Sequence, residues 1–370
     1  MAGIYFHIPF CRRICAYCDF YKNADLRLKE QTLAAMEREV VARRDFLRGE
    51  AVRTIYFGGG TPSLASAEWI GRAIELCRAT FDCRAVEEIT LEANPDDLSQ
   101  EYLAALRRVG VNRLSIGIQS FDDEVLRTMN RRHDAAAAIS AVEKARAAGF
   151  DNITIDLIYG LPFGPKDALA RSLAQAVALD VEHISAYHLT IEPNTAFGRR
   201  LARGEMSEVA EDQSEKEYAM LHKRLTEAGF EHYEVSNYAL EGFRAKHNSS
   251  YWQGVEYLGI GVGAHSFNGE VRHYSEQSIE EYVERREYVV EQLTPRDHYN
   301  EYVMTALRRK EGIDCLFVSE NFGEKALQRV KEGVAPWVES GDVVLDEKSI
   351  KIPAERFMIS DAVIESLFEV

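Results

Sequence analysis

The sequence predicts an α/β protein: a partial (β/α)6 barrel followed by a small C-terminal α+β unit that is winged-helix-like. Up to Pro193, short β-branched runs alternate with segments of helical periodicity, and each run precedes a polar or glycine-rich loop. Strands separated by helices pair in parallel through right-handed crossovers, and six such units curve into an incomplete barrel. Residues that carry chemistry are therefore expected on the loops that follow the strands.

The elements of the barrel follow from these runs. The expected strands are Gly3 to Ile8, Val52 to Phe57, Glu88 to Ala93, Arg113 to Ile118, Asn152 to Tyr159 and His183 to Leu189. Helical periodicity between them is clear at Leu26 to Leu47 and at Ala135 to Ala148.

The alternation weakens after Pro193. Helices are expected near Glu208 to Ala228 and at Ile279 to Leu293, with glycine-rich and aromatic segments between them. A separate unit is expected from Thr294, with a helix at Pro295 to Arg308, a hairpin around Asp342 to Ile352 and a closing helix to Phe368. The predicted domains are a barrel over 1–235, an extension over 236–293 and a C-terminal domain over 294–370.

Composition limits the classes of function. With 370 residues and 46% hydrophobic content, the chain is expected to fold around a large core. Its 60 acidic and 44 basic side chains give a net charge of -16, which disfavours nucleic acid as a partner and a radical enzyme acting on RNA. The first residues lack the pattern of a signal peptide, and no window is apolar enough for an integral membrane segment. A cytoplasmic protein is expected, so the six cysteines are read as metal ligands or buried thiols.

The first loop carries the strongest signal. Cys11-x3-Cys15-x2-Cys18 follows the first strand directly. Three thiolates on a tight loop can each bind one iron of a 4Fe-4S cubane, which leaves the fourth iron free to bind and cleave S-adenosylmethionine (SAM). Zinc is the alternative, but it needs a fourth ligand, and His7 on the preceding strand is poorly placed. The scattered Cys77, Cys83 and Cys315 are expected to be buried small side chains.

The loops after the next strands fit a site for SAM. Gly58, Gly59 and Gly60 lack a Cβ and so let the backbone approach a ligand, and Thr61 follows them. Arg131 is the best nearby cation for the methionine carboxylate, because a guanidinium binds a carboxylate in a bidentate fork.

Polar side chains also mark the ends of later strands. Glu92 ends the third strand, Gln119 follows the fourth, and Asp156 lies within the apolar fifth strand, where a charge needs a partner or a cavity. Each of these residues alone could equally be a cap, a turn or a surface pair. Their recurrence at successive strand ends behind a three-cysteine loop favours a common site.

Longer motifs bring these residues together. They are Tyr5-x-His7-Ile8-Pro9-Phe10-Cys11 running on to Tyr17-Cys18-Asp19-Phe20, Gly58 to Pro62, Arg113 to Phe121 and Asp156 to Pro162. Over nearly its whole length the chain resembles the oxygen-independent coproporphyrinogen III oxidase family of radical SAM proteins. The resemblance implies cluster ligation by Cys11, Cys15 and Cys18. It implies SAM contacts from Tyr5, Gly60, Thr61, Glu92, Gln119, Arg131 and Asp156, with Tyr17 and Phe20 near the adenine.

The family has two branches, an oxidase that decarboxylates propionates and a branch regarded as heme chaperones. Three departures from the oxidase favour the chaperone: Phe20 replaces a fourth cysteine, only ten residues precede Cys11, and His247-Asn248-x2-Tyr251-Trp252 resembles the motif of the chaperone branch. The expected partners are then heme and acceptor hemoproteins. A homodimer, the acceptor and the axial heme ligand are left open.

The last motif has its own chemistry. If Lys246 to Trp252 is helical, His247 and Tyr251 share a face, which places an imidazole able to bind heme iron beside an aromatic ring able to pack on porphyrin, with Trp252 alongside. The alternative is a buried tryptophan with a helix-capping His-Asn pair. The other histidines, His183, His188 and His265 among them, are read as core or rim residues, and the segments of His188 and His265 can border the site.

Overall fold

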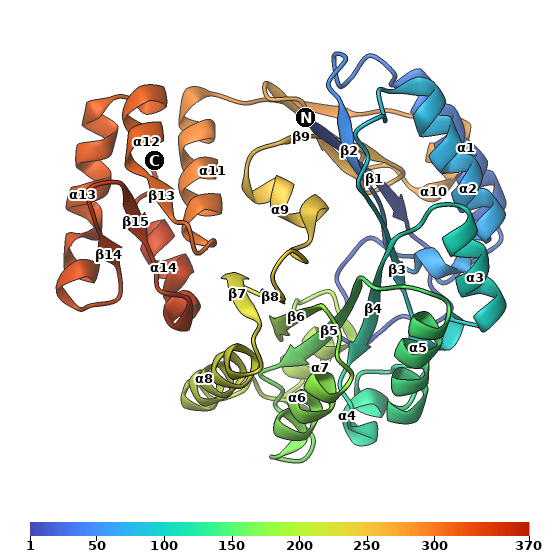
Figure 1. The fold of residues 1–370 in the computed structure, drawn as a ribbon, viewed down its shortest axis with the longest axis horizontal. Helices are drawn as coiled ribbons and strands as arrows, with labels where there is room; N and C mark the ends of the chain where they lie inside the picture. Colours follow the sequence, from blue (N-terminus) through green and yellow to red (C-terminus); the bar gives the residue numbers. More distant parts are fainter. Residues whose placement is uncertain (370) are drawn as a thin grey trace.

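The computed structural model describes residues 1–369 and contains a parallel sheet at its centre (Figure 1). All six strands expected for the barrel are present and pair in parallel, in the order in which they occur in the chain. They are β1 (Ala2–Ile8), β2 (Val52–Gly59), β3 (Glu88–Ala93), β4 (Arg113–Gln119), β5 (Ile153–Tyr159) and β6 (His183–His188). The predicted bounds hold to within two residues, because β-branched runs bounded by polar loops mark the strand ends closely.

The sheet continues beyond these six strands at both edges. On one side β9 (Glu256–Ile260) pairs in parallel with β1, and the antiparallel strands β10 (His265–Phe267), β11 (Val271–Tyr274) and β12 (Val289–Gln292) follow it. On the other side β8 (Asn237–Ala239) and β7 (Glu231–Glu234) extend β6. The twelve-stranded sheet has two separate edges, β12 and β7, so the barrel is curved but open.

Helices cover the outer face of the curved sheet, at the right and bottom of Figure 1. The α-helices are α1 (Lys29–Ala42), α2 (Ala67–Thr80), α3 (Gln100–Arg108), α4 (Asp123–Thr128), α5 (Ala135–Ala147), α6 (Ala168–Ala178), α7 (Ala196–Ala202) and α8 (Glu211–Glu227). Two short 3-10 turns, η1 (Pro62–Leu64) and η2 (Pro95–Asp97), follow β2 and β3.

Alternation along β1 shows how the strands separate core from site. Phe6 is fully buried and packs on Phe57 of β2 and Trp69 of α2, with ring centroids 4.8 and 6.1 Å apart. Tyr5, one residue earlier, instead packs against Tyr56, at a centroid distance of 5.9 Å. Successive side chains of a strand point to opposite faces, so one face of β1 makes the hydrophobic core and the other lines the concave side of the sheet.

One expected helix is wrong in part. The segment Ile279 to Leu293 forms the short helix α10 (Ile279–Glu284) and then strand β12. Ser278 and Glu281 make a capping box that starts the helix. The backbone becomes extended at Arg285, and the β-branched pair Val289-Val290 pairs with β11. Tertiary pairing therefore overrides the helical periodicity in the second half of the segment.

The C-terminal unit, orange to red in Figure 1, lies beside the concave side of the sheet, with α9 (Lys246–Trp252) between them. The expected helix and hairpin are confirmed. Its elements are α11 (Pro295–Leu307), β13 (Ile313–Asp314), α12 (Cys315–Phe322), α13 (Glu324–Glu339), β14 (Val344–Leu345), β15 (Ser349–Lys351), η3 (Ala354–Ile359) and α14 (Ser360–Glu365). The three strands form a small antiparallel sheet in the order β13-β15-β14.

Within residues 1–369, none of the helices has the length and apolar character that crossing a membrane requires.

Candidate functional site

The cysteine loop begins where β1 ends, at the C-terminal edge of the parallel strands. Backbone hydrogen bonds hold it on two sides: the Cys11 N–H donates to the Asn23 carbonyl at 2.9 Å, and the Ala16 N–H donates to the Met129 carbonyl at 3.0 Å. The Thr61 hydroxyl donates to the Cys11 sulfur at 3.3 Å. Burial raises the pKa of the Cys11 thiol, so a metal that binds this sulfur has to displace its proton.

The three thiols of this loop are the predicted ligands of the cluster. Cys11 is buried, Cys15 and Cys18 are half-buried, and all are free thiols. Among residues 1–369, no three His, Cys, Asp or Glu side chains are grouped so that they could hold one metal ion. A cubane takes each thiolate at a different corner iron, whereas zinc takes its ligands around a single point. The donor set fits a cluster, and the assignment of these three ligands stays a prediction.

Arg131 connects the cysteine loop to the ends of β3 and β4. One terminal nitrogen lies 3.3 Å from the Cys15 sulfur. The other donates to the Asn94 side-chain oxygen at 2.7 Å and to the Gly117 carbonyl. The Arg131 Nε–H is buried without an acceptor among residues 1–369. That spare donor fits the prediction that Arg131 binds the carboxylate of SAM.

The glycine-rich loop after β2 packs directly on the start of the cysteine loop. A Cβ on Gly60 would lie 2.8 Å from the carbonyl carbon of Pro9 and 2.9 Å from the carbonyl oxygen of Ile8. Gly59 has a φ of +105°, which side chains other than glycine rarely adopt. Both glycines are therefore required for the contact between the two loops, and Thr61 is buried beside them.

Two carboxyl groups lie inside the concave side of the sheet. The Glu92 carboxylate accepts hydrogen bonds from the Tyr56 hydroxyl at 2.8 Å and from the Gly59 N–H at 3.2 Å. The Ser115 hydroxyl donates to Asp156 at 3.3 Å. Burial raises the pKa of Glu92 to about 7 and that of Asp156 to about 6. Such carboxyl groups can accept hydrogen bonds from hydroxyl or ammonium groups of a ligand at neutral pH.

The remaining residues predicted around SAM have different surroundings. Gln119 is buried at a register shift of β4, with a φ of +71°, and lines a cavity of about 520 Å³. Tyr17 lies beside Cys15 and Arg131, and burial is the main reason that its pKa is raised. Phe20 is 69% exposed and lines a different, larger cavity. The predicted stacking of Tyr17 and Phe20 near adenine stays a prediction.

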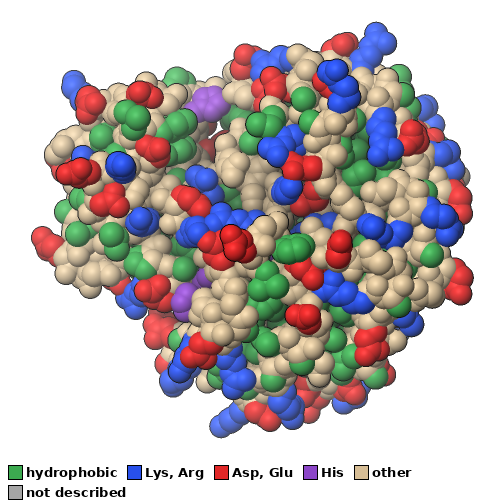
Figure 2. Space-filling view, viewed as in Figure 1, with side chains coloured by type: hydrophobic (Ala, Val, Ile, Leu, Met, Phe, Trp, Pro, Cys, Tyr) green, Lys and Arg blue, Asp and Glu red, His purple; other side chains and the backbone are tan. Residues whose placement is uncertain are grey.

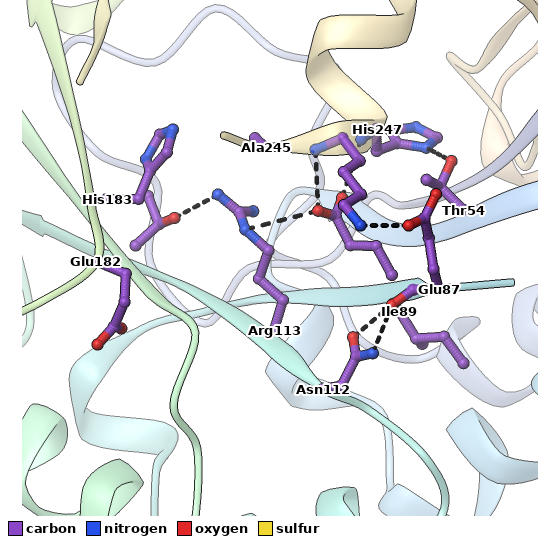
Figure 3. A network of polar contacts seen from close by, with 12 residues as sticks. Thr54, Glu87, Ile89, Asn112, Arg113, Glu182, His183, Ala245 and His247 are labelled. Atoms are coloured by element: carbon purple, nitrogen blue, oxygen red, sulfur yellow. Dashed lines mark hydrogen bonds and ion pairs between the residues drawn. The ribbon is translucent and has the colours of Figure 1, made fainter. Parts of the chain in front are cut away.

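The motif at 247–252 lies in helix α9, as predicted, and its first residues enter a buried polar network (Figure 3). The N–H groups of Lys246 and His247 each donate to the Glu88 carboxylate at 2.9 Å. The His247 Nδ1 is paired with the Thr54 hydroxyl at 2.8 Å. Arg113 lies 4.0 Å from Glu88 and completes the charge balance of the network.

His247 and Tyr251 share one face of α9, also as predicted, and the His247 Nε2 is paired with the Tyr251 hydroxyl at 2.8 Å. Both ring nitrogens of His247 are therefore occupied, and burial lowers its pKa to about 3. Thr54 and Glu88 lie near the N-terminal ends of β2 and β3, whereas the cysteine loop lies at the C-terminal edge of the parallel strands. The contacts favour a structural role for His247, but not as the predicted helix cap, because the N-cap of α9 is Ala245 and Trp252 is only half-buried. The role of His247 as axial heme ligand stays a prediction that these hydrogen bonds count against.

A large cavity, of about 1570 Å³, lies between the concave side of the sheet and the C-terminal unit. Figure 2 shows the molecule hollowed there, to the right of the C-terminal unit. Tyr5 and Phe20 line it on the barrel side, Tyr251 and Trp252 line it from α9, and Phe317 lines it from the C-terminal unit. No sequence pattern predicts this cavity, because it forms between segments far apart in the chain.

The segment of His265 was expected to border the site, and this histidine does line the cavity. Four further polar side chains of the cavity carried no prediction: Arg272 from β11, and His298, Arg309 and Lys348 from the C-terminal unit. The run from Gly259 to Gly263, which precedes His265 and permits close backbone packing, is a further signal in this segment.

Comparisons with known proteins place the chain. Residues 5–176 match the Radical SAM superfamily. The heme chaperone HemW of Lactococcus lactis subsp. lactis is 36% identical over 84% of this chain and 82% of its own length. HemW of Mycobacterium tuberculosis is 33% identical over 99% of this chain and 94% of its own length. This chain belongs to the HemW family.

A solved structure of an oxygen-independent coproporphyrinogen III oxidase has the same fold, which agrees with the resemblance of this chain to that wider family. Coproporphyrinogen III oxidase (HemN) from Escherichia coli, described as a radical SAM enzyme, superposes with a TM-score of 0.85 at 25% identity. The match covers 99% of this chain and 89% of that one, so it includes the C-terminal unit. Two predictions are therefore confirmed. One is the family resemblance carried by the sequence motifs, and the other is the fold, a partial barrel with an α+β unit.

Membership of the Radical SAM superfamily implies a 4Fe-4S cluster and SAM. The residues present fit these groups: a three-cysteine loop with a buried guanidinium against one thiol, and a glycine-rich loop packed on it. Heme is implied only by the name of the HemW relatives.

Proposed function

We propose that this protein is a radical SAM heme chaperone, which binds heme, holds a 4Fe-4S cluster with SAM, and transfers heme to acceptor hemoproteins. The observation that carries the proposal is the similarity to HemW proteins over nearly the full length of both chains, 99% and 94% for the relative from Mycobacterium tuberculosis. A similarity of this extent includes the barrel, α9 and the C-terminal unit together.

On the cofactor side, Cys11, Cys15 and Cys18 would bind three irons of the cluster. When bound, a cluster of this kind supplies one electron that can cleave SAM. The Arg131 guanidinium would hold the Cys15 sulfur at 3.3 Å, and its unpaired Nε–H would donate to a ligand carboxylate. Glu92 accepts a hydrogen bond from a ligand and can keep its own proton near neutral pH, because burial raises its pKa to about 7.

On the heme side, the large cavity offers what a porphyrin needs. Tyrosine, tryptophan and phenylalanine rings line it, and aromatic faces stack on a flat apolar macrocycle. The cavity lies between two structural units rather than inside one core. Small movements of the C-terminal unit against the barrel can therefore admit and release a ligand, as delivery to another protein requires.

A second candidate is oxygen-independent coproporphyrinogen III oxidase. The fold favours it, because the TM-score with HemN is 0.85. The side chain at position 20 argues against it, because a phenylalanine stands where the resemblance to the oxidase calls for a fourth cysteine, and it lies 69% exposed in the cavity.

One experiment separates the two. The protein is reconstituted anaerobically with iron and sulfide and given SAM, dithionite and either hemin or coproporphyrinogen III. If the protein is a heme chaperone, we expect hemin to give a protein-specific Soret band and to pass to an apo-globin probe. We expect no loss of propionate carboxyl groups from coproporphyrinogen III. Loss of propionates that needs SAM, together with only the spectrum of free hemin, would replace the chaperone by the oxidase.

A further inference from the structure

We infer that heme iron is bound by His265, in the cavity between the barrel and the C-terminal unit, and that His247 is a structural residue. The inference rests on the proposed function, because it names the ligand of the heme that this function requires. It is independent of the motif at 247–252, whose histidine is the residue that the sequence pattern favours.

The histidines around the cavity differ in whether a ring nitrogen is available to bind iron. An axial ligand needs one unprotonated imidazole nitrogen that faces open space. His247 uses both nitrogens, on Thr54 and Tyr251. His7, which lines the cavity, also uses both: Nδ1 is paired with the Tyr5 hydroxyl at 3.1 Å and Nε2 with the Tyr21 carbonyl at 2.9 Å.

His265 is different, since its ring has no hydrogen-bond partner among residues 1–369. It lines the cavity and is exposed toward it. The ring is held in place by stacking on Tyr274, with centroids 5.1 Å apart and planes 17° apart. The imidazole is thus oriented before a ligand arrives, which reduces the entropy lost on binding.

The backbone beneath His265 is rigid as well. The next residue, Ser266, is fully buried, and its hydroxyl accepts hydrogen bonds from Arg43 and from the Gly259 N–H, both at 2.9 Å. Because side chains alternate along a strand, burying Ser266 in this network turns His265 to the opposite side, toward the cavity.

Protonation favours iron binding at this residue. Partial desolvation lowers the pKa of His265, and the nearby Arg272 lowers it further, while Glu291 opposes them. The imidazole is therefore neutral at pH 7, which is the form that binds iron.

Side chains of both charges line the cavity: three cations, Arg272, Arg309 and Lys348, and the carboxylates of Asp19, Glu301, Glu311 and Asp314. Arg272 is already paired with Glu291 and Glu301. By contrast, Arg309 and Lys348 line the cavity without a carboxylate within 4.0 Å among residues 1–369. These two cations from the C-terminal unit are available to pair with propionates, while the aromatic residues contact the apolar part of the macrocycle.

His298 is a second histidine of the cavity whose ring could bind heme iron. It lines the cavity from α11, and no hydrogen bond to its ring is formed within residues 1–369. No aromatic ring of residues 1–369 stacks on it, whereas Tyr274 orients His265. His298 therefore serves as the matched control, since it is a histidine of the same cavity on the other structural unit.

The test uses the full chain with its cluster reconstituted and hemin as the probe. Soret spectra, resonance Raman spectra and hemin titrations are compared for wild type, His265→Gly, His298→Ala and His247→Ala. We expect His265→Gly alone to lose the imidazole-ligated spectrum and to bind hemin roughly tenfold or more weakly. Added imidazole should restore the spectrum, which a merely unfolded variant would not allow.

The outcomes are separable. If wild type gives no protein-specific heme spectrum, the proposed function fails and the inference fails with it. If wild type binds heme but His265→Gly keeps its spectrum, or if His247→Ala or His298→Ala alone abolishes it while far-UV circular dichroism is unchanged, the inference is overturned and the chaperone function stands.

Discussion

Replacing His247 by alanine tests whether the motif at 247–252 holds the structure together. The side chain is 1% exposed, and its two ring nitrogens pair with the hydroxyls of Thr54 and Tyr251. The ring also stacks on Tyr56, with centroids 4.9 Å apart. Losing two buried hydrogen bonds at about 1 kcal/mol each and part of the buried ring surface should lower the free energy of unfolding by about 2 to 4 kcal/mol.

The assay is urea denaturation of the reconstituted protein, followed by far-UV circular dichroism. Thr54→Val is the matched control, because it keeps the shape of residue 54 and removes only one of the two hydrogen bonds, for an expected loss of about 1 kcal/mol. The double variant should then lose less than the sum of the single losses, because the two residues contact each other. A His247→Ala protein within about 0.5 kcal/mol of wild type would refute the reasoning.

Three further predictions concern the cofactor side. Cys15→Ala should remove the 4Fe-4S absorbance after reconstitution, because two thiolates cannot retain a cubane with an open corner; full iron and sulfide content would contradict this. Arg131→Ala should weaken SAM binding by about 1.5 to 3 kcal/mol in equilibrium dialysis if the contact is direct, and an unchanged affinity would show that the guanidinium serves only Cys15 and Asn94. The pKa of Glu92 is raised from 4.5 to about 7, so the folded protein keeps a proton that the unfolded chain releases. Stability from this group is complete below pH 4.5 and is lost as the pH rises toward 7. Glu92→Gln should reduce the pH dependence of the free energy of unfolding, measured in urea, between pH 4.5 and 7. An unchanged pH dependence would show that Glu92 does not cause it.

Much of the barrel could be predicted because its determinants are local. The run from Glu88 to Ala93 matches β3 at both ends, since β-branched residues and the following Asn94-Pro95 mark a strand and its end within a few positions. The second half of the segment Ile279 to Leu293 could not be assigned in this way. Val289 and Val290 become a strand only because β11 offers them a partner, and such partners are invisible to a short window of sequence.

The candidate site, like the fold, could be predicted only where its determinants are local in the sequence. Local spacing indicated the three-cysteine loop, and the shared face of His247 and Tyr251 followed from helical geometry and is confirmed at 2.8 Å. Spacing could not indicate that Thr54, almost two hundred residues earlier, binds the other nitrogen of His247. A pattern reports which side of an element a residue occupies, but not what packs against that side.

Residue type and spacing along the chain therefore indicated the six parallel strands of the barrel, the cysteine loop and the family. The folded structure was needed to show that both ring nitrogens of His247 are paired, whereas the ring of His265 has no hydrogen-bond partner among residues 1–369. His265 became a candidate ligand because the antiparallel strands at the edge of the large sheet turn it toward the C-terminal unit, while burial beside β2 and β3 closes both nitrogens of His247. Whether the ring nitrogens of a histidine are hydrogen-bonded depends on which groups lie next to it in space, and the packing of the whole chain decides which groups these are.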